Sequence, residues 1–266
     1  MTAAPSLNGV SQDLSGSPDE IIIVSHAGLW EILRMMTLLI ATQNAHKVEE
    51  IRAILSDRFK YLTLRDFPAA PGVVEDAQTF SGNATKKAVQ LARWLQATPG
   101  LKPQFSLPLY VMADDSGLEV DALQGAPGVH SARFAALDTT QEGNSTDAEN
   151  NAKLLRLLKD TPLEKRTARF RCVLALTPLL EPSVESASPA CAADEFEVQT
   201  ELFDGTCEGR IQLVAAGQGG FGYDPLFVPS GHKESFAELG EAVKNQLSHR
   251  AKALAKLHVR LDALGL

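Results

Sequence analysis

The stretch VMADDSGLEVDALQGAPGVHSARFA, residues 111–135, places two adjacent aspartates directly after an apolar run. Residues 109–113 have the length and composition of a buried strand. Side chains alternate along a strand, so Asp114 and Asp115 should point in opposite directions wherever the strand persists. One carboxylate then anchors a turn, and the other faces solvent or a ligand. The pair alone leaves two interpretations open: an Asx-turn at a strand end, or a site for a hard cation such as Mg²⁺.

Segments with strand and helix patterns alternate on both sides of this stretch. Apolar runs predict strands at residues 37–41, 109–113, 167–176 and 195–203, and helical spacing predicts helices at 47–55, 83–95 and 148–159, with a last one starting near Ser248. Asp147 is the expected N-cap of the helix at 148–159. The strands at 167–176 and 195–203 are expected to form a hairpin with a long loop at 178–194. The pattern favours an α/β fold with a mixed sheet.

The composition is that of a globular protein and excludes some function classes. The 266 residues are 44% hydrophobic and carry a formal net charge of −8, which argues against a general nucleic-acid binder. Three cysteines without CxxC spacing indicate neither a zinc site nor a disulfide framework, as is typical of cytoplasmic proteins. Residues 21–41 are apolar, but His26, Glu31 and Arg34 interrupt them, so we expect no membrane span.

The N-terminal residues differ in composition from the rest of the chain. Residues 1–20 are rich in Ser, Gly, Pro and Asp and lack the basic start of a secretory signal. The Met35-Met36 pair comes just before the first expected strand. We therefore expect residues 1–36 to be an extension, disordered or preceding a later start, and residues 37–266 to form the folded domain.

Two polar clusters lie at expected helix starts. Residues 42–47 occupy a strand-to-helix turn, where backbone N–H groups attract anions and Lys47 adds a charge; the alternative is an N-cap with a surface lysine. Glu75 precedes a helix that carries Lys87, and the two could reach opposite ends of a metal–phosphate group. The alternative is ordinary helix-start polarity. The chain has no G-x-x-x-x-G-K-[ST] phosphate loop, so a nucleotide site must be built differently.

Two further clusters lie in the last fifth of the chain. Residues 217–225 are rich in glycine, and Phe221 and Tyr223 offer flat faces on which a base could stack. The alternative is a simple hairpin loop. Lys244 is followed by His249 and Arg250, and the arginine offers a fork of donors for carbonyl or phosphate oxygens. Helix-start polarity is again the alternative.

Taken together, these segments resemble the inosine triphosphate pyrophosphatases, also called Ham1-like proteins or XTP/dITP diphosphatases. The resemblance runs from about residue 37 to the C-terminus. It rests on six motifs in the family's order: Thr42-x-Asn44-x-x-Lys47, Glu75 with Thr79-Phe80 and Asn83-Ala84, Asp114-Asp115-Ser116-Gly117-Leu118, Gly125-Ala126-Pro127-Gly128, Phe221-Gly222-Tyr223-Asp224-Pro225 and Ser248-His249-Arg250.

The resemblance implies hydrolysis of ITP, dITP and XTP to the monophosphate and pyrophosphate, with Mg²⁺ as cofactor and a homodimer as the assembly. It also implies an elongated α/β fold with a mixed central sheet and a substrate cleft between two lobes. Asp115 matches the family's general base and metal ligand, and Glu75 a second metal ligand. The implied substrate-binding residues are Thr42, Gln43, Asn44, Ala45, His46, Lys47, Lys87, Ser116, Phe221, Gly222, Tyr223, Asp224, Lys244, His249 and Arg250. We expect Asp115 to do the chemistry and Asp114 to support the turn.

The chain departs from the family pattern at two motif positions. Gly82 replaces the usual Glu before Asn83, and Gln43 replaces the usual Gly. The loop at 178–194 is also longer than usual. The alternative functions are a Maf-type pyrophosphatase acting on other modified nucleotides, a catalytically silent nucleotide-binding protein, and a receiver-type signalling domain. In a receiver the acidic pair would follow the first strand, and here it lies far into the chain.

Overall fold

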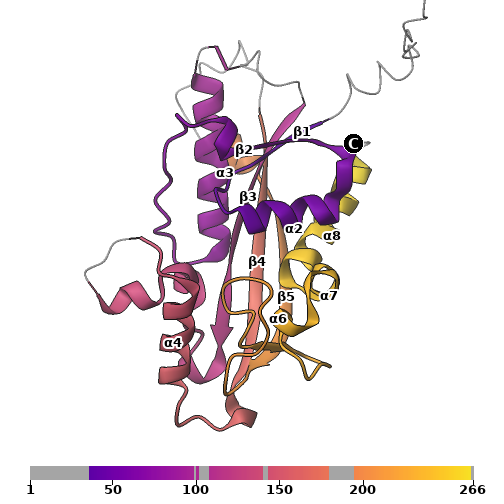
Figure 1. The fold of residues 1–266 in the computed structure, drawn as a ribbon. Coiled ribbons are helices and arrows are strands. Elements are labelled where there is room, and N and C mark those ends of the chain that lie inside the picture. The colour runs from indigo at the N-terminus through magenta and orange to yellow at the C-terminus, as the bar shows by residue number, and fades with distance from the viewer. Residues whose placement is uncertain (1–35, 99, 102–107, 140–142, 180–194, 265–266) are drawn as a thin grey trace, which may run out of the picture. The chain divides into compact units, whose positions relative to one another are not determined.

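The computed structural model describes residues 36–98, 100–101, 108–139, 143–179 and 195–264. A mixed six-stranded sheet in the order β2-β1-β3-β4-β5-β6 organises them (Figure 1). β1 runs parallel to both of its neighbours, and the remaining pairs are antiparallel. The strands are β1 (Thr37–Ile40), β2 (Lys60–Thr63), β3 (Leu109–Val120), β4 (Thr167–Pro178), β5 (Glu201–Ile211) and β6 (Phe227–Pro229).

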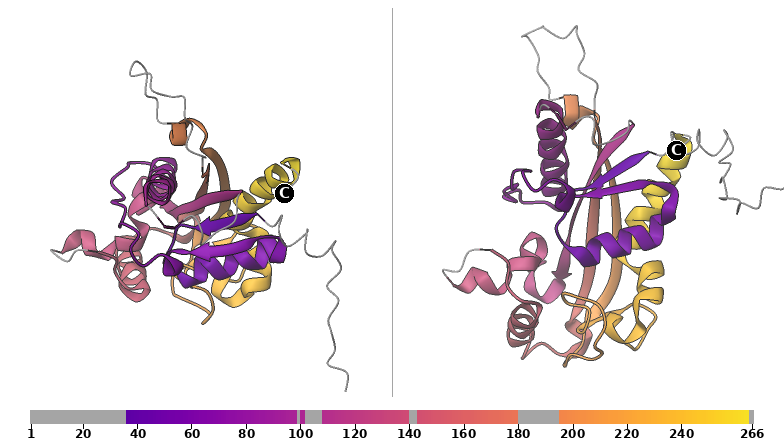
Figure 2. Two further views of the ribbon diagram at one scale, coloured as in Figure 1. Left: turned by 90° about the horizontal axis from the view of Figure 1, so that it is seen from above. Right: turned by 45° about the horizontal axis from the view of Figure 1, so that its top comes forward.

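The main helices lie on both faces of the sheet. α3 covers one face, and α2 and α8 lie together on the other (Figure 2). Within the described residues, no helix combines the length and the apolar character needed to cross a membrane. The α-helices are α2 (Ala45–Leu55), α3 (Phe80–Ala97), α4 (Asp147–Leu157), α5 (Glu195–Val198), α6 (Phe236–Leu239), α7 (Glu241–Leu247) and α8 (His249–Ala263). Short 3₁₀ helices are η1 (Ser56–Arg58), η2 (Leu64–Asp66), η4 (Asp121–Leu123), η5 (Gly128–Arg133), η6 (Ala135–Asp138) and η7 (Leu163–Lys165).

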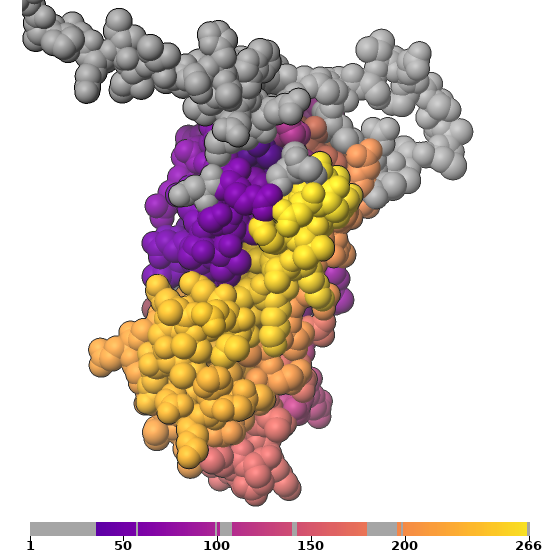
Figure 3. All heavy atoms as spheres, turned by 90° about the vertical axis from the view of Figure 1, so that its right-hand side faces the viewer, coloured from indigo at the N-terminus to yellow at the C-terminus, as the bar shows by residue number. Residues whose placement is uncertain are grey.

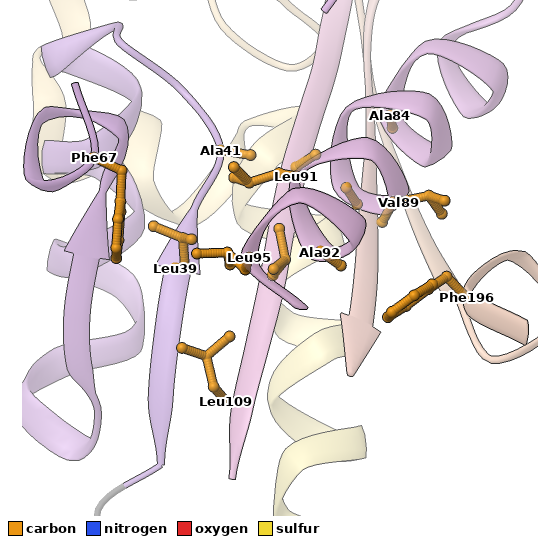
Figure 4. Close-up of a cluster of buried hydrophobic side chains, with 14 of the residues drawn as sticks. Leu39, Ala41, Phe67, Ala84, Val89, Leu91, Ala92, Leu95, Leu109 and Phe196 are labelled. Atoms are coloured by element: carbon orange, nitrogen blue, oxygen red, sulfur yellow. The ribbon is translucent and has the colours of Figure 1, made fainter. Parts of the chain in front are cut away.

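Alternate side chains of β1 and of the first half of β3 contribute to two different core clusters. Leu39 and Val111 pack with α3 in one cluster, part of which is drawn in Figure 4. Leu38 and Met112, their neighbours along the chain, pack with α2 and α8 in the other. Figure 3 shows the surface of this second side, where α2 and α8 are in contact. Because alternate side chains point to opposite faces, a residue's position in β3 decides which helix it meets.

β3 is longer than its apolar run predicts. It does not end at residue 113 but continues through both aspartates to Val120, and Asp114 and Asp115 pair in register with Leu174 and Val173 of β4. The prediction of a turn at the aspartates is therefore wrong, and so is the turn-supporting role given to Asp114. β4 satisfies the backbone of this segment along its whole length, so polar side chains do not break the strand.

Two further local predictions need correction. Thr146, not Asp147, caps α4: its side chain accepts the backbone N–H of Glu149, whose carboxylate in turn accepts the N–H of Thr146. Residues 195–198 form helix α5, and the strand begins only at residue 201. The predicted hairpin is confirmed, since β4 and β5 are antiparallel neighbours. Residues 180–194 of its loop, and residues 1–35 of the predicted extension, lie outside the described residues, so that extension stays a prediction.

A glycine in β5 brings the last helix against the sheet. A Cβ at Gly205 would lie 2.0 Å from the backbone oxygen of His249 and 2.6 Å from the nitrogen of Ala253. Only a residue without a side chain permits such a close approach of helix and strand. The first turn of α8 is thereby held against β5 and β4, and Arg250 is buried there in contact with Asp114 of β3.

Candidate active site

A pocket of about 460 Å³ lies between the start of α2, the segment that precedes α3 and the middle of β3. It brings together polar side chains from four distant parts of the sequence. Those that were predicted from the sequence are Thr42, Gln43, Asn44, Lys47, Glu75, Lys87, Asp115 and Ser116. Asp114 and Arg133, which were not among the predicted site residues, line it as well.

The start of α2 forms one wall of this pocket. Asn44 is the N-cap, and its side chain accepts the backbone N–H of Lys47 at 3.3 Å. The hydroxyl of Thr42 accepts the N–H of Asn44 at 3.2 Å. The first turn contains no acidic residue, so its N–H groups and Lys47 make this wall electropositive.

Asp115 points to the α3 side of β3. Lys87 lies between it and Glu75: the ammonium nitrogen is 3.0 Å from Asp115 Oδ1, 3.4 Å from Glu75 Oε2 and 2.8 Å from the backbone oxygen of Asp114. Burial raises the pKa of Asp115 to about 6, although Lys87 and Lys47 act in the opposite direction. Burial lowers the pKa of Lys87, but the nearby Asp115 and Glu75 outweigh it and the net shift is upward. Asp115 is thus a carboxylate that gains and loses its proton close to neutral pH.

The side chain of Asp114 points to the opposite side of β3, where protein groups contact both of its carboxylate oxygens. Arg250 Nε donates to its Oδ2 at 2.9 Å, and Lys47 forms an ion pair with its Oδ1. The hydroxyl of Ser116 and the thiol of Cys172 donate to it at 3.0 and 3.2 Å. Burial alone would raise its pKa, but Arg250 and Lys47 hold the pKa well below its usual range. Asp114 therefore carries a fixed negative charge.

Glu50 is a half-buried carboxylate that was not predicted from the sequence. It accepts from Lys244 at 2.7 Å and also forms an ion pair with Arg250. Lys244 in turn donates to Asp224 at 2.6 Å. The signal for Glu50 was its helical spacing from Lys47, which places both side chains on one side of α2. These ion pairs connect α2 with α7, α8 and the glycine-rich loop.

The glycine-rich loop contacts the start of α2 without lining the pocket. The ring of Phe221 stacks on that of His46, with centroids 5.4 Å apart and an interplanar angle of 12°, and Lys244 lies 4.2 Å from its centroid. The N–H of Gly222 donates to Asp147 at 2.6 Å, and Tyr223 donates from a buried hydroxyl to the backbone oxygen of Ser131. His46 is thus placed toward the loop, whereas its neighbour Lys47 is placed toward the pocket. Ala45, the first residue of α2, and Asp224 do not line the pocket either.

The two residues that open α8 have different surroundings. His249 is buried and stacked on Phe170, with centroids 4.8 Å apart, and its Nδ1 has no hydrogen-bond partner among the residues that the structure describes. Burial, followed by the charge of Arg250, holds the pKa of His249 well below its usual range, so the ring is neutral. Arg250 lies behind the pocket, where it donates to Ser116 Oγ at 2.9 Å. Neither lines the pocket itself.

The donor set at Lys87 fits a hard cation. Asp115 and Glu75 present carboxylate oxygens to one pocket, and Mg²⁺ is commonly held by one or two carboxylates with phosphate oxygens and water. Over the described part of the chain, no group of three or more His, Cys, Asp or Glu side chains could hold a metal ion. A cation at this position would therefore complete its coordination with substrate and solvent oxygens.

Comparisons with known proteins agree on one family. The family model described as the Ham1 family matches residues 38–259. The chain is 40% identical over 230 residues to the dITP/XTP pyrophosphatase of Shouchella clausii, covering 86% of this chain and 98% of that one. It is 44% identical over 224 residues to that of Geobacillus kaustophilus, covering 84% and 93%.

Solved structures show the same likeness. A HAM1 protein from Coxiella burnetii matches with a TM-score of 0.66 and 33% identity, covering 86% of this chain and all of that one. The Staphylococcus aureus Ham1 protein matches with a TM-score of 0.65 and 31% identity, covering 85% and 98%. The predicted fold class, a mixed sheet flanked by helices, is confirmed.

Proposed function

This chain belongs to the Ham1 family, and we propose that it hydrolyses the non-standard purine nucleoside triphosphates ITP, dITP and XTP to the monophosphate and pyrophosphate. The observation that carries the proposal is one pocket in which Lys47 and Lys87 lie beside the carboxylates of Asp115 and Glu75. The lysines suit a triphosphate, and a carboxylate with a pKa of about 6 suits proton abstraction from water.

The phosphate chain is proposed to lie along the start of α2. Lys47, Lys87 and the N–H groups of the first turn bind its oxygens and orient the α-phosphorus toward Asp115. Asp115 accepts a proton from a water molecule as the water oxygen bonds to the α-phosphorus. The bond between that phosphorus and the oxygen bridging to the β-phosphate breaks, and pyrophosphate leaves with the electron pair. The two lysines stabilise the charge that develops on it.

We propose Mg²⁺ as the cofactor, held by Asp115 and Glu75. When bound there it supplies positive charge next to the phosphate oxygens and offsets the charge of the leaving group. The donor chemistry described above supports this assignment. Lys87 contacts both carboxylates and so keeps them close together.

The purine is proposed to bind at the glycine-rich loop. Phe221 offers a ring face for stacking, worth roughly 1–3 kcal/mol per base. The Nδ1 of the buried, neutral His249, which has no partner among the described residues, is proposed as the donor to a 6-oxo group. Adenine would present a donor there instead, and an unpaired polar group opposes binding. The homodimer implied by the resemblance and the cytoplasmic location indicated by the cysteine usage remain proposals, and light scattering of the full chain tests the first.

Asp115→Asn tests the assignment of the base. Pyrophosphate release from ITP with Mg²⁺ should fall by roughly 10²- to 10⁴-fold, the usual contribution of a general base. Asp121→Asn, which alters an exposed carboxylate just after β3, serves as the matched control and should keep wild-type turnover.

Measuring wild-type release from ITP, XTP and ATP separates the rival functions. Turnover of ITP and XTP well above that of ATP supports the proposal. Binding of ITP without pyrophosphate release would instead indicate a silent nucleotide-binding protein. Near-wild-type turnover by Asp115→Asn would remove the catalytic role from Asp115.

A further inference from the structure

Asn83 connects the two acidic segments of the pocket. It lies in the first turn of α3 and is completely buried. Its Oδ1 accepts the backbone N–H of Ala77 at 3.0 Å, and its Nδ2 donates to Asp115 Oδ2 at 3.3 Å. Because a backbone N–H can only donate, the oxygen of the amide must face Ala77 and the NH₂ group must face Asp115. A single side chain therefore touches Asp115 and the segment that carries Glu75.

Two side chains hold the backbone of the Glu75 segment, one at Glu75 itself and one just after it. Asn83 holds the N–H of Ala77, two residues after Glu75, and Arg133 Nη2 donates to the backbone oxygen of Glu75 at 3.0 Å. These hydrogen bonds act on the backbone and leave the carboxylate of Glu75 to Lys87 and the pocket. Asn83 and Arg133 thus fix where Glu75 lies relative to Asp115.

Gly82 explains how the segment comes close enough to Asn83. A Cβ at this position would lie 2.8 Å from the Cβ of Ala77 and 3.1 Å from Thr79 Oγ1. Any side chain here would push residue 77 away from the helix, and with it the N–H that Asn83 accepts. The glycine that departs from the family pattern is therefore a packing requirement of this particular segment.

We propose that Asn83, together with the close packing at Gly82, positions Asp115 and Glu75 relative to each other and so sets the affinity of the pocket for a divalent cation. The inference rests on the proposed function, because it assumes that these two carboxylates hold the cation. Asn83 touches neither substrate nor cation and acts through Asp115 and through the backbone of Ala77. Partners of this kind, behind a metal ligand, typically change metal affinity by about 10- to 100-fold.

The test measures Mn²⁺ binding to the metal-free full-length protein by the loss of the free-ion electron paramagnetic resonance signal. Asn83→Ala should raise the Mn²⁺ dissociation constant by about tenfold or more. It should raise the Mg²⁺ concentration needed for half-maximal pyrophosphate release by a similar factor. Asn150→Ala is the matched control, because Asn150 is also buried and also accepts a backbone N–H, that of Ala135, while donating to the oxygen of Ala132. The control should keep the wild-type Mn²⁺ constant.

Gly82→Ala provides a second variant in case Asn83→Ala does not fold. It removes no hydrogen-bonding side chain, and the higher helix propensity of alanine offsets part of the cost of the contact with Ala77, so the variant should fold while its Mn²⁺ binding weakens. Wild-type Mn²⁺ constants in both variants would overturn the inference and leave the proposed function standing. If the wild-type protein itself binds no Mn²⁺, the proposed cation site fails, and the inference with it.

Discussion

The two sides of β3 at the acidic pair have similar burial and opposite electrostatics. Asp114 is 2% exposed and Asp115 is 6% exposed, yet the pKa of the first lies well below its usual range and that of the second is raised to about 6. Arg250 and Lys47 both reach Asp114, whereas Asp115 shares Lys87 with Glu75. In both cases burial makes the ionised carboxylate unfavourable. The number of cationic side chains that contact the carboxylate decides whether this desolvation cost is offset.

This difference gives two adjacent residues of β3 different roles: Asp114 stabilises the fold, and Asp115 is suited to chemistry. The α2/α8 side of β3 is a closed network of ion pairs that joins Asp114, Glu50, Asp224, Lys244 and Arg250. The α3 side leaves Asp115 only partly compensated and facing the pocket. A carboxylate that titrates near neutral pH is suited to accept a proton, and one held far below it is not.

The largest expected effect comes from breaking the α2/α8 side. Asp114→Asn keeps the size of the side chain but leaves Arg250 and Lys47 with less compensating charge in a buried place. We expect the free energy of unfolding to fall by about 3–5 kcal/mol, the usual result of removing one partner of a buried ion pair. Urea denaturation followed by circular dichroism measures the change. A loss below about 1 kcal/mol would show that the network is not closed as described.

The same substitution one residue later should have the opposite sign. A raised carboxyl pKa means that the folded protein binds the proton more tightly than the unfolded chain does. Ionised Asp115 therefore costs stability above its folded pKa of about 6, and this cost disappears below the unfolded value of 3.8. Asp115→Asn should be more stable than wild type by roughly 1–3 kcal/mol at neutral pH in metal-free buffer.

Thermal unfolding of both proteins across this pH range checks the sign. The advantage of Asp115→Asn should shrink as the pH is lowered to about 4, because wild-type Asp115 then takes up its proton. An advantage independent of pH would point to packing rather than to charge. A variant less stable than wild type at neutral pH would contradict the partial compensation of Asp115.

The smallest expected effect concerns an ion pair of similar length at the surface. Lys256 lies 2.7 Å from Asp204, a separation close to that between Arg250 and Asp114, but both side chains are more than half exposed. Lys256→Ala should change the free energy of unfolding by less than about 1 kcal/mol, because solvent screens the pair. Urea denaturation under the conditions used for Asp114→Asn gives the comparison. Equal losses would mean that bond length, not burial, governs these pairs.

Much of the architecture follows from local sequence patterns. Periodicity predicted the strand at residues 37–41 and the helices at 47–55 and 83–95, because each has one apolar face or is apolar throughout. Strand alternation predicted that the two aspartates point in different directions, which their partners confirm. Eight of the residues predicted from the motif resemblance line one pocket.

The errors arose where distant residues override local preference. Polar residues after 113 were predicted to form a turn, but β4 pairs with them and buried cations compensate Asp114. The strand predicted at 195–203 instead runs from residue 201 to residue 211, through two glycines of a kind that usually weakens strands. Gly205 and Gly209 instead admit α8 and Phe227 at close range. Glu50 and Asn83 could not be assigned roles, since their partners are remote in sequence.

The positive and negative side chains of the pocket nearly cancel, and this affects the rate at which an anionic substrate binds. Its cationic side chains, those of Lys47, Lys87 and Arg133, are matched by the carboxylates of Glu75, Asp114 and Asp115, and the whole chain carries a formal charge of −8. An approaching polyanion therefore meets no attractive long-range field, and electrostatic steering contributes little to its association rate. Capture then depends on collisions in which the phosphate chain already faces the start of α2. Neutralisation of part of the nucleotide's charge in solution would make such collisions more frequent.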